Sequence, residues 1–244
     1  MLPLPQPGRS TDNRILAALN DSDSARMFSQ LARVSMAQGA VIYEAETQID
    51  HVYFPETAVF SILCEMENGD TVEVGPVGNE GLVGLPIFFQ EKTSLDRVIV
   101  HVAGDAMRLR ATALTEELSN NASALPEKVL RYTQMLLAMT ARSGACNKLH
   151  RLEQQLARWM LLMSDYVGDE LHLTHELIAL TLGVRRAGVT VAANGFRTAG
   201  LIGYQRGHIE VLDRVGLEAL ACECYQIIKR DYEHLYSDLS RPAK

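Results

Sequence analysis

Hydrophobic and polar positions alternate in short runs from about residue 34 to residue 110. The runs are rich in Val, Ile, Tyr and Phe and end at Gly, Asn, Asp or Pro, as in AVIYEA, HVYFPETAVFSIL, TVEVGPVG and RVIVHVAG. Short strands separated by regularly spaced turn signals are typical of an antiparallel barrel, sandwich or roll. Glu67-Asn68-Gly69-Asp70 predicts a hairpin turn, because Asn-Gly readily adopts the positive φ angles that such a turn needs.

The pattern changes near residue 125, where hydrophobic residues begin to recur at helical spacing and Pro126 suits a first turn. They form two stripes, one of Val129, Tyr132, Leu136 and Met139, the other of Leu130, Leu137, Ala141, Ala145 and Leu149. Two apolar stripes need two partners. We therefore expect one to pack on the β domain and the other on a second copy of the chain, which makes 125–150 a dimerisation helix. A further helix is expected from about Arg151 to Asp165, with a domain boundary near His150.

Residues 172–212 predict two short helices and a hairpin. Thr174 is a good N-cap for a first helix, Gly183 breaks the chain at a tight turn, and a second helix follows from about Arg186 to Ala199. Gln205-Arg206-Gly207 then joins two short apolar runs as a hairpin. Helix, glycine turn, helix and hairpin together are typical of a winged helix-turn-helix.

Charge supports a nucleic-acid role for this part of the chain alone. The formal net charge of the protein is −7, which by itself argues against such a role. Residues 177–209, however, contain four arginines and no acidic residue, and a phosphate backbone needs such a local positive field. The first turn of a recognition helix can offer its side chains to base edges in the major groove, and Arg can bond guanine in two places. The expected DNA-binding residues are Thr174, Arg185, Arg186, Gly188, Thr190 and, at the tip of the wing, Arg206.

Composition indicates the class of protein and the environment in which it works. The chain has 244 residues, of which 47% are hydrophobic and 22% charged, as in ordinary soluble globular proteins. No apolar run is long enough to cross a membrane and the N-terminus lacks the apolar core of a signal peptide, so we expect a cytoplasmic protein without a membrane partner. Cys64 and Cys146 are expected in the core. Cys222-Glu223-Cys224 lacks a second pair at ligand spacing, so no metal site is expected and its role stays open.

The order of several segments resembles the CRP/FNR family of bacterial transcription regulators over about residues 30–230. The segments are VYFPETAVFSI, EVGPVGNEGLVGL, NKLHRLEQQLARWML, LTHELIALTLGVRRAGVTVAA and AGLIGYQRGHIEV. The resemblance implies an α+β chain with a short arm (1–20), a cupin-like antiparallel β-roll of the cyclic-nucleotide-binding type (21–124), a dimerisation helix (125–150) and a winged helix-turn-helix (151–244). It also implies a homodimer on a partly palindromic DNA operator, with RNA polymerase as a further partner. Ala187 and Val191 stand where cyclic-AMP-type relatives carry Glu and a second Arg, so the operator should differ from theirs.

The resemblance also indicates where an effector would bind. The family's phosphate-binding segment has Gly-Glu followed later by an Arg, and the best alignment places Gly84, Leu85 and Arg97 there. The ribose-binding carboxylate is then missing, which argues against cyclic AMP. An iron–sulfur cluster is not expected, because no cysteine precedes Cys64. His51 and His101 are available to a haem, although a lone His in a β domain is usually structural. The effector is left unidentified.

Two other classes of function were weighed. An enzyme is not expected, because the sequence lacks the G-x-S-x-G, H-E-x-x-H, Walker and dinucleotide-binding motifs. His172-x-x-His175 lacks a third metal ligand and is expected to line the helix-turn-helix surface. The alternative is a β-roll module for a ligand or a protein whose DNA-binding part has lapsed, which Gly188 and Gly195 favour slightly, because glycine weakens a helix.

Overall fold

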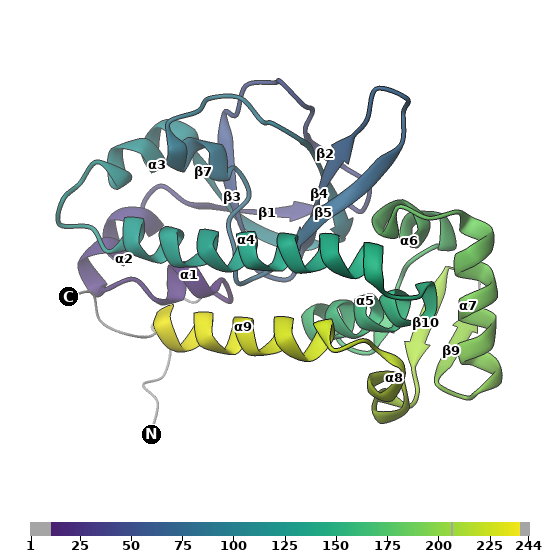
Figure 1. The fold of residues 1–244 in the computed structure, drawn as a ribbon. Helices are drawn as coiled ribbons and strands as arrows, with labels where there is room; N and C mark the ends of the chain where they lie inside the picture. The colour runs from purple at the N-terminus through teal and green to yellow at the C-terminus, as the bar shows by residue number, and fades with distance from the viewer. Residues whose placement is uncertain (1–10, 206, 240–244) are drawn as a thin grey trace. The chain divides into compact units, whose positions relative to one another are not determined.

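The computed structural model describes residues 11–205 and 207–239, which fall into two compact units (Figure 1). The β-roll unit comprises 11–62, 76–136 and 233–239, and the helix-turn-helix unit comprises 63–75 and 137–232. The long helix α4 (Leu125–Leu149) and the last helix α9 (Cys224–Leu239) run through both units. Residues 1–10 of the arm expected at 1–20 lie outside the described residues, and the rest contains the short helix α1 (Arg14–Ala17).

Two antiparallel sheets build the β-roll, of which residues 63–75 group with the helix-turn-helix unit. One has the order β1-β7-β3 and the other β2-β6-β4-β5. The first pairs His51 with Arg110 and Pro55 with Ala106 along β3 and β7. The predicted β-roll is thus confirmed. Its elements are α1 (Arg14–Ala17), α2 (Asp21–Phe28), β1 (Ala32–Met36), β2 (Val41–Tyr43), β3 (His51–Pro55), β4 (Val59–Glu65), β5 (Thr71–Val77), η1 (Leu85–Phe89), β6 (Arg97–Val102), β7 (Gly104–Arg110) and α3 (Ala111–Leu118).

Strand alternation and turn chemistry follow the sequence pattern. Along β3, Val52 and Phe54 are buried while His51 and Tyr53, which alternate with them, are partly exposed. The hairpin between β4 and β5 turns where it was predicted. Gly69 has a φ of 86°, and the amide of Met66 donates to the carbonyl of Asp70 over 2.8 Å.

The first half of α4 packs tightly on the segment 78–84. Tyr132 is fully buried, and a Cβ atom at Gly81 would lie only 2.6 Å from Cε2 of the Tyr132 ring. No side chain fits there, so position 81 needs glycine for this close approach. The stripe predicted to face the β domain, which includes Val129 and Met139, is buried as well.

The helix-turn-helix unit has the predicted order of helix, turn, helix and hairpin. One short strand before the two central helices and two strands after them form a small antiparallel sheet of order β8-β10-β9. The elements are α5 (Leu152–Val167), β8 (Glu170–Leu171), α6 (His175–Leu182), α7 (Arg186–Thr198), β9 (Ile202–Gln205), β10 (His208–Val211), α8 (Arg214–Leu220) and the start of α9. None of the helices in the described part of the chain is long and apolar enough to cross a membrane.

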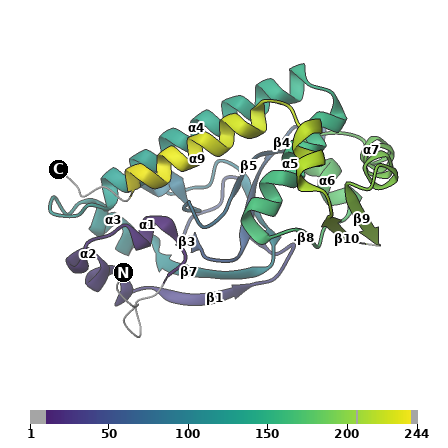
Figure 2. The same ribbon diagram turned by 90° about the horizontal axis from the view of Figure 1, so that it is seen from below.

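The sequence did not indicate that α9 returns along α4. The two helices lie side by side in both ribbon views (Figures 1 and 2), and the hydroxyl of Tyr232 donates to Sδ of Met139 over 3.1 Å. α9 thus covers one side of α4. The second stripe of α4 stays open, with Leu130, Leu137 and Leu149 exposed by 56%, 70% and 77%.

Candidate nucleic-acid interface

The turn between α6 and α7 is fixed by local hydrogen bonds. Thr174 caps α6, its hydroxyl accepting from the amide of Leu177 over 3.2 Å. Gly183 ends α6 in the left-handed region, with φ 63° and ψ 36°, and the amide of Val184 bonds back to the carbonyl of Ala179. The sequence Thr174–Gly183 therefore sets both the start of α6 and the direction in which α7 leaves it.

The phase of α7 decides which of its side chains can meet a ligand. Its buried residues are Val189, Ala192, Ala193 and Phe196, which face α5 and α6. The opposite face is exposed and carries Ala187, Val191, Asn194 and Thr198. A recognition helix reads base edges with such an outward face, so these positions form the candidate reading surface.

Arg185 and Arg186 stand at the start of α7 and are both exposed. Arg185 is the N-cap residue, and its carbonyl accepts the amide of Gly188 over 2.9 Å. Arg186 forms an ion pair with Glu176 of α6, with 2.9 Å between Nη1 and Oε1. The side chains of that pair are exposed by 65% and 58%, so the guanidinium stays within reach of solvent and of a ligand.

Thr190 lies one turn further along, and its hydroxyl already has two partners. It donates to the carbonyl of Arg186 over 3.1 Å and lies 3.0 Å from Nδ1 of His175. His175 in turn stacks on Tyr204 with 4.5 Å between ring centroids. Burial, and then the charge of Arg186, lower the pKa of His175 and so favour the neutral ring. The methyl group of Thr190, rather than its hydroxyl, is therefore the part left for an outside contact.

The two glycines of α7 have different surroundings. A Cβ atom at Gly188 would lie 2.8 Å from Cδ2 of Leu152, so this position faces the neighbouring helix α5. At Gly195 a Cβ atom would meet nothing within 4 Å. Gly188 was expected among the DNA-binding residues, and its place in the structure is on the inner side of α7.

Three further exposed residues of α7 were not among the expected DNA-binding residues. Val191 is exposed by 71%, and Asn194 and Arg197 are exposed as well. Valine can contact a thymine methyl group, asparagine can bond adenine in two places, and arginine can reach a phosphate. The helical phase set by Val189 and Phe196 was the signal that could have identified them.

The hairpin after α7 is the predicted wing. β9 and β10 pair from Ile202 with Val211 to Gln205 with His208. Arg206, expected at the tip, lies outside the described residues. The side chains of His172 and His175 turn to different partners, because His172 contacts the ring of His208 with 4.8 Å between centroids. They therefore do not form a metal-binding pair with each other.

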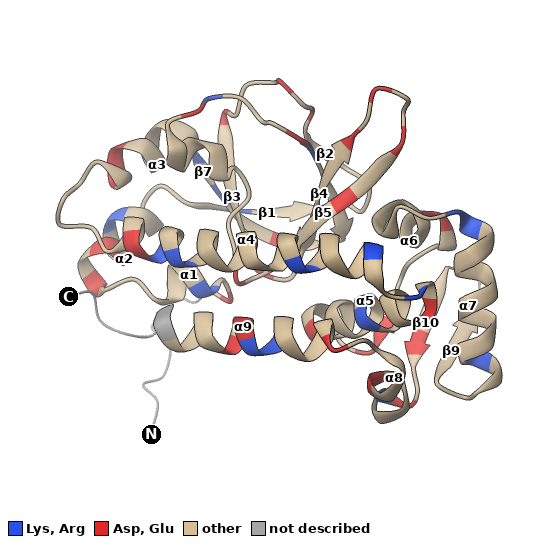
Figure 3. Cartoon of the chain, in the orientation of Figure 1, with Lys and Arg blue, Asp and Glu red and all other residues tan. Residues whose placement is uncertain are grey.

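Positive charge marks both ends of α7. Figure 3 shows Lys and Arg near its start and near its end, and the acid-free stretch runs from 177 to 209. Glu176 and Glu210 border that stretch in the sequence. The exposed face of α7 thus carries little charge between its ends, with two arginines at its N-terminus, where the helix dipole adds further positive potential.

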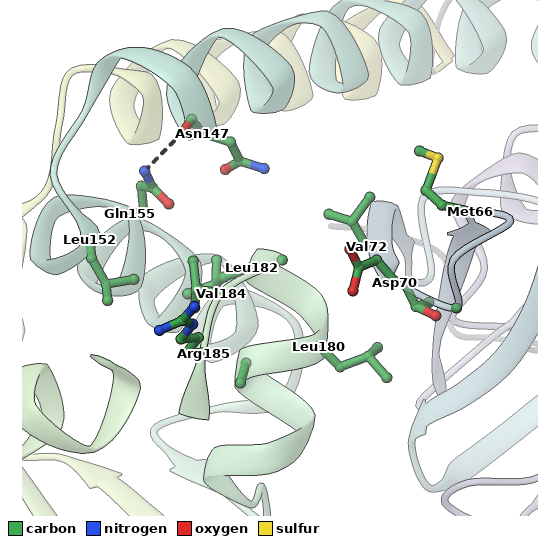
Figure 4. A pocket seen from close by; sticks show the side chains of 14 residues that line it. Met66, Asp70, Val72, Asn147, Leu152, Gln155, Leu180, Leu182, Val184 and Arg185 are labelled. Atoms are coloured by element: carbon green, nitrogen blue, oxygen red, sulfur yellow. Dashed lines mark hydrogen bonds between the residues drawn. The ribbon is translucent and has the colours of Figure 1, made fainter. Parts of the chain in front are cut away.

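A cavity of about 870 Å³ lies in the same unit, beside the start of α7 (Figure 4). Gln155 stands on its wall and donates to the carbonyl of Asn147 over 3.3 Å. A group bound in the cavity would be next to Arg185. Its lining comes from Met66 and 69–72 of the β4–β5 hairpin, from Asn147, Leu152 and Gln155, and from 179–180 and 182–185.

The residues expected to hold an effector lie around Tyr43. Gly84 has a φ of 102° and begins η1 with Leu85, and a Cβ atom there would lie 2.7 Å from Val52 and 3.0 Å from the Tyr43 hydroxyl. Arg97 starts the strand that pairs with β2, and its Nε lies 3.3 Å from Oε2 of Glu44. Gly84 is therefore closely packed, and Arg97 has a carboxylate partner within the fold.

Comparison with known proteins agrees with this geometry. Residues 154–220 match the family model described as a Crp-like helix-turn-helix domain. No curated protein sequence matches the chain. The structure of FixK2 from Bradyrhizobium japonicum is similar at a TM-score of 0.68 and 15% identity, over 79% of this chain and 98% of that one.

Two further solved structures have the same fold. A CRP/FNR family transcriptional regulator from Thermus thermophilus gives a TM-score of 0.64 and 21% identity, over 78% of this chain and 98% of that one. The c-di-GMP responsive global regulator CLP of Xanthomonas campestris gives 0.63 and 12%, over 79% of this chain and 99% of that one. At these identities the likeness establishes the fold of the matched part, about 79% of the chain, and the family model identifies a Crp-like helix-turn-helix domain within it.

Proposed function

We propose that this chain, with its Crp-like helix-turn-helix domain on the fold of CRP/FNR regulators, is a DNA-binding transcriptional regulator. It binds a partly palindromic operator as a homodimer, under the control of a signal received by the β-roll. The observation that carries the proposal is the position of α7, which exposes one face along its length and places Arg185 and Arg186 at its first turn.

Recognition divides between two groups of side chains. Arg186 reads a guanine edge in the major groove, and Val191 with the Thr190 methyl group contacts thymine. Arg185, Arg197 and the wing supply phosphate contacts that position the helix without reading sequence. The near-neutral outward face of α7 differs from a reading surface built on Glu and a second Arg, so the operator differs from that of cyclic-AMP-type regulators.

The open stripe of α4 supports the homodimer. Leu130 and Leu137 lie seven residues apart on one face, Ala141 and Ala145 continue it, and all four are exposed. Exposed leucines in line on a long helix are costly unless a partner covers them. A second copy that presents the same stripe closes a symmetric pair and places two recognition helices one DNA turn apart.

The β-roll is the proposed sensor, with Gly84, Leu85 and Arg97 as candidate effector residues. An anionic ligand at Arg97 would replace Glu44, and an ion pair this exposed is weak enough to exchange, at about 0–1 kcal/mol. The signal then moves the segment 147–151 and so aligns or misaligns the two recognition helices. Contact with RNA polymerase completes the proposed regulation.

Selection of bound sites from random duplex DNA tests the proposal. The full-length protein is used without added ligand and again with a small-molecule extract of cells, and a variant with both Arg185 and Arg186 changed to Ala is the control. We expect enrichment of a two-fold symmetric site whose half-sites lie about 34 Å apart. Failure to enrich any sequence under both conditions would contradict the regulator and favour a β-roll module with lapsed DNA binding.

A further inference from the structure

Three cysteines and a histidine meet in the helix-turn-helix unit, away from the face of α7 described above. Their ligand atoms all lie within 4.8 Å of one another, and the three cysteines are buried. They come from two places, the C-terminal end of α4 with the residue that follows it, and the segment 222–224 that leads into α9. We call them the Cys₃His cluster, consisting of Cys146, His150, Cys222 and Cys224.

The fold supplies the second ligand pair that the sequence lacks. Cys222-x-Cys224 has no partner at a recognisable spacing, because Cys146 and Cys222 are 76 residues apart in the chain. Cys146 and His150 are four residues apart, and the amide of His150 bonds to the carbonyl of Cys146 over 3.0 Å. This helical turn places both side chains on one side of α4, facing the start of α9.

The distances suit ligands that share a single ion. The Sγ atoms of Cys146 and Cys222 are 3.4 Å apart, and Sγ of Cys224 is 3.8 Å from Nδ1 of His150. A tetrahedral zinc ion with Zn–S bonds of about 2.3 Å separates its ligand atoms by about 3.8 Å. In a four-iron cluster each ligand binds a different iron, so the ligand atoms lie further apart than this.

The surroundings complete the site as a metal centre requires. With Nδ1 turned toward the cysteines, Nε2 of His150 lies 3.2 Å from Oε2 of Glu223, an arrangement in which a carboxylate orients a metal-binding histidine. The guanidinium of Arg158 is buried and donates to the Ser143 hydroxyl over 3.2 Å. Its charge favours the thiolate forms of Cys146 and Cys224. Its positive charge offsets the net negative charge of three thiolates around a dication.

Both supporting segments are held in place independently of a metal. Gln155 donates to the carbonyl of His150 over 2.8 Å and so fixes the end of α4. Tyr225, next to Cys224, donates to Asp165 over 3.0 Å and accepts from Arg214 over 2.6 Å, which ties the start of α9 to α5 and α8. Hydrogen bonds within the fold therefore fix both segments that carry the Cys₃His cluster.

We propose that the Cys₃His cluster binds one zinc ion in tetrahedral coordination and so joins the end of the dimerisation helix to the start of α9. All four positions are taken by protein side chains, so the site is of the closed, structural type and has no open position for a reacting molecule. Zinc binding here stabilises the segment that links dimerisation to DNA binding, whether or not the DNA operator is bound.

Metal analysis of the untagged full-length protein tests the proposal. We expect about one zinc ion per chain by mass spectrometry of the digested protein. Cys146→Ser, Cys222→Ser and Cys224→Ser should each lose it, whereas Cys64→Ser, the matched control on β4, should keep it. Loss of zinc from the control as well would overturn the assignment to the Cys₃His cluster.

Cobalt keeps the proposal testable even if the cysteine variants fail to fold. Wild-type protein stripped by a chelator and titrated with Co²⁺ should show thiolate charge-transfer bands and the strong visible bands of a tetrahedral ion. Glu223→Gln, at a side chain that is 70% exposed, should keep the fold and bind Co²⁺ about 10- to 100-fold more weakly.

Three results would overturn the proposal. One is wild-type protein that takes up neither zinc nor cobalt after reduction. The second is a disulfide between Cys146 and Cys222 in protein purified without reductant, unaffected by added zinc. The third is bound iron with sulfide, which would mean a cluster in place of a single ion.

Discussion

Arg186 and Glu176 form an ion pair across the turn of the helix-turn-helix, with 2.9 Å between Nη1 and Oε1. Both side chains are more than half exposed, so the pair contributes only about 0–1 kcal/mol to stability. In the proposed complex the same guanidinium is needed by the DNA. Glu176 therefore competes with the operator for Arg186, and its carboxylate adds a negative charge close to the expected path of the phosphates.

Removal of that charge should strengthen DNA binding. We expect Glu176→Gln to bind operator severalfold more tightly, a change of about 1 kcal/mol, while its melting temperature stays nearly the same. Fluorescence anisotropy at two salt concentrations measures this. Weaker binding would mean that Glu176 holds Arg186 in its reading position instead of competing for it.

Loss of the arginine itself should have the opposite effect. Arg186→Ala is expected to cost about 1–3 kcal/mol of binding free energy and to relax specificity at one base of each half-site. Arg230→Ala, the same change at an exposed residue of α9, is the control. Competition with operators altered at single positions measures both properties. Full affinity and an unchanged base preference would show that Arg186 does not read the operator.

The glycines of α7 should respond differently to alanine. Gly195→Ala places its methyl group in open space and should raise the free energy of unfolding by about 1 kcal/mol without changing DNA affinity. Gly188→Ala should raise the free energy of unfolding by less, because its Cβ atom would displace the end of the Leu152 side chain. Urea denaturation and DNA titration are the measurements. A Gly195→Ala variant with lost affinity would show that the helix backbone approaches DNA closely there.

The open stripe of α4 should control assembly. Leu137→Asp replaces an exposed side chain, so the single chain should keep its fold, but the proposed homodimer should dissociate and lose about 100-fold in operator affinity. Val215→Asp, at a residue of α8 exposed by 79%, makes the same chemical change elsewhere. Analytical ultracentrifugation should give a monomer for the first variant and a dimer for the second. If both variants were dimers, this stripe would be excluded as the interface.

Stability should fall in mild acid through His101. Burial lowers the pKa of this histidine from 6.5 to about 4, and its Nδ1 lies 2.9 Å from the Ser61 hydroxyl. Between these two pH values the unfolded chain binds a proton that the folded chain does not. The stabilisation, on the order of 3 kcal/mol, is therefore complete above pH 6.5 and is lost as the pH falls toward 4. His101→Gln should show a flatter dependence of unfolding free energy on pH over this window, and an equally steep one would contradict the assignment.

Local patterns were enough to predict the β-roll, the helices and the turn. Asn68-Gly69 and Gly183 act within their own turns, and the stripes of α4 follow from a period that is set along one helix. The arginines at the start of α7 were found for the same reason, since charge and helix position are both local. Which side of α7 each residue faces depends on the helical phase fixed by Val189 and Phe196. Gly188, expected to bind DNA, lies beside Leu152 of α5, while Val191 is exposed.

Long-range contacts explain what the sequence could not reveal. The return of α9 along α4 depends on tertiary packing of residues such as Tyr232 and Met139, and no local signal encodes it. The same return brings Cys222 and Cys224 to Cys146. Each pair of ligands looks incomplete in the sequence, and their meeting is a property of the fold alone.

The contact of Tyr132 with Gly81 has a mechanical consequence. Because the aromatic ring already occupies the place of a Cβ atom at position 81, the segment 78–84 and the first half of α4 cannot shift independently of each other. A movement of the segment 78–84 must therefore carry Tyr132 and its turn of α4 with it.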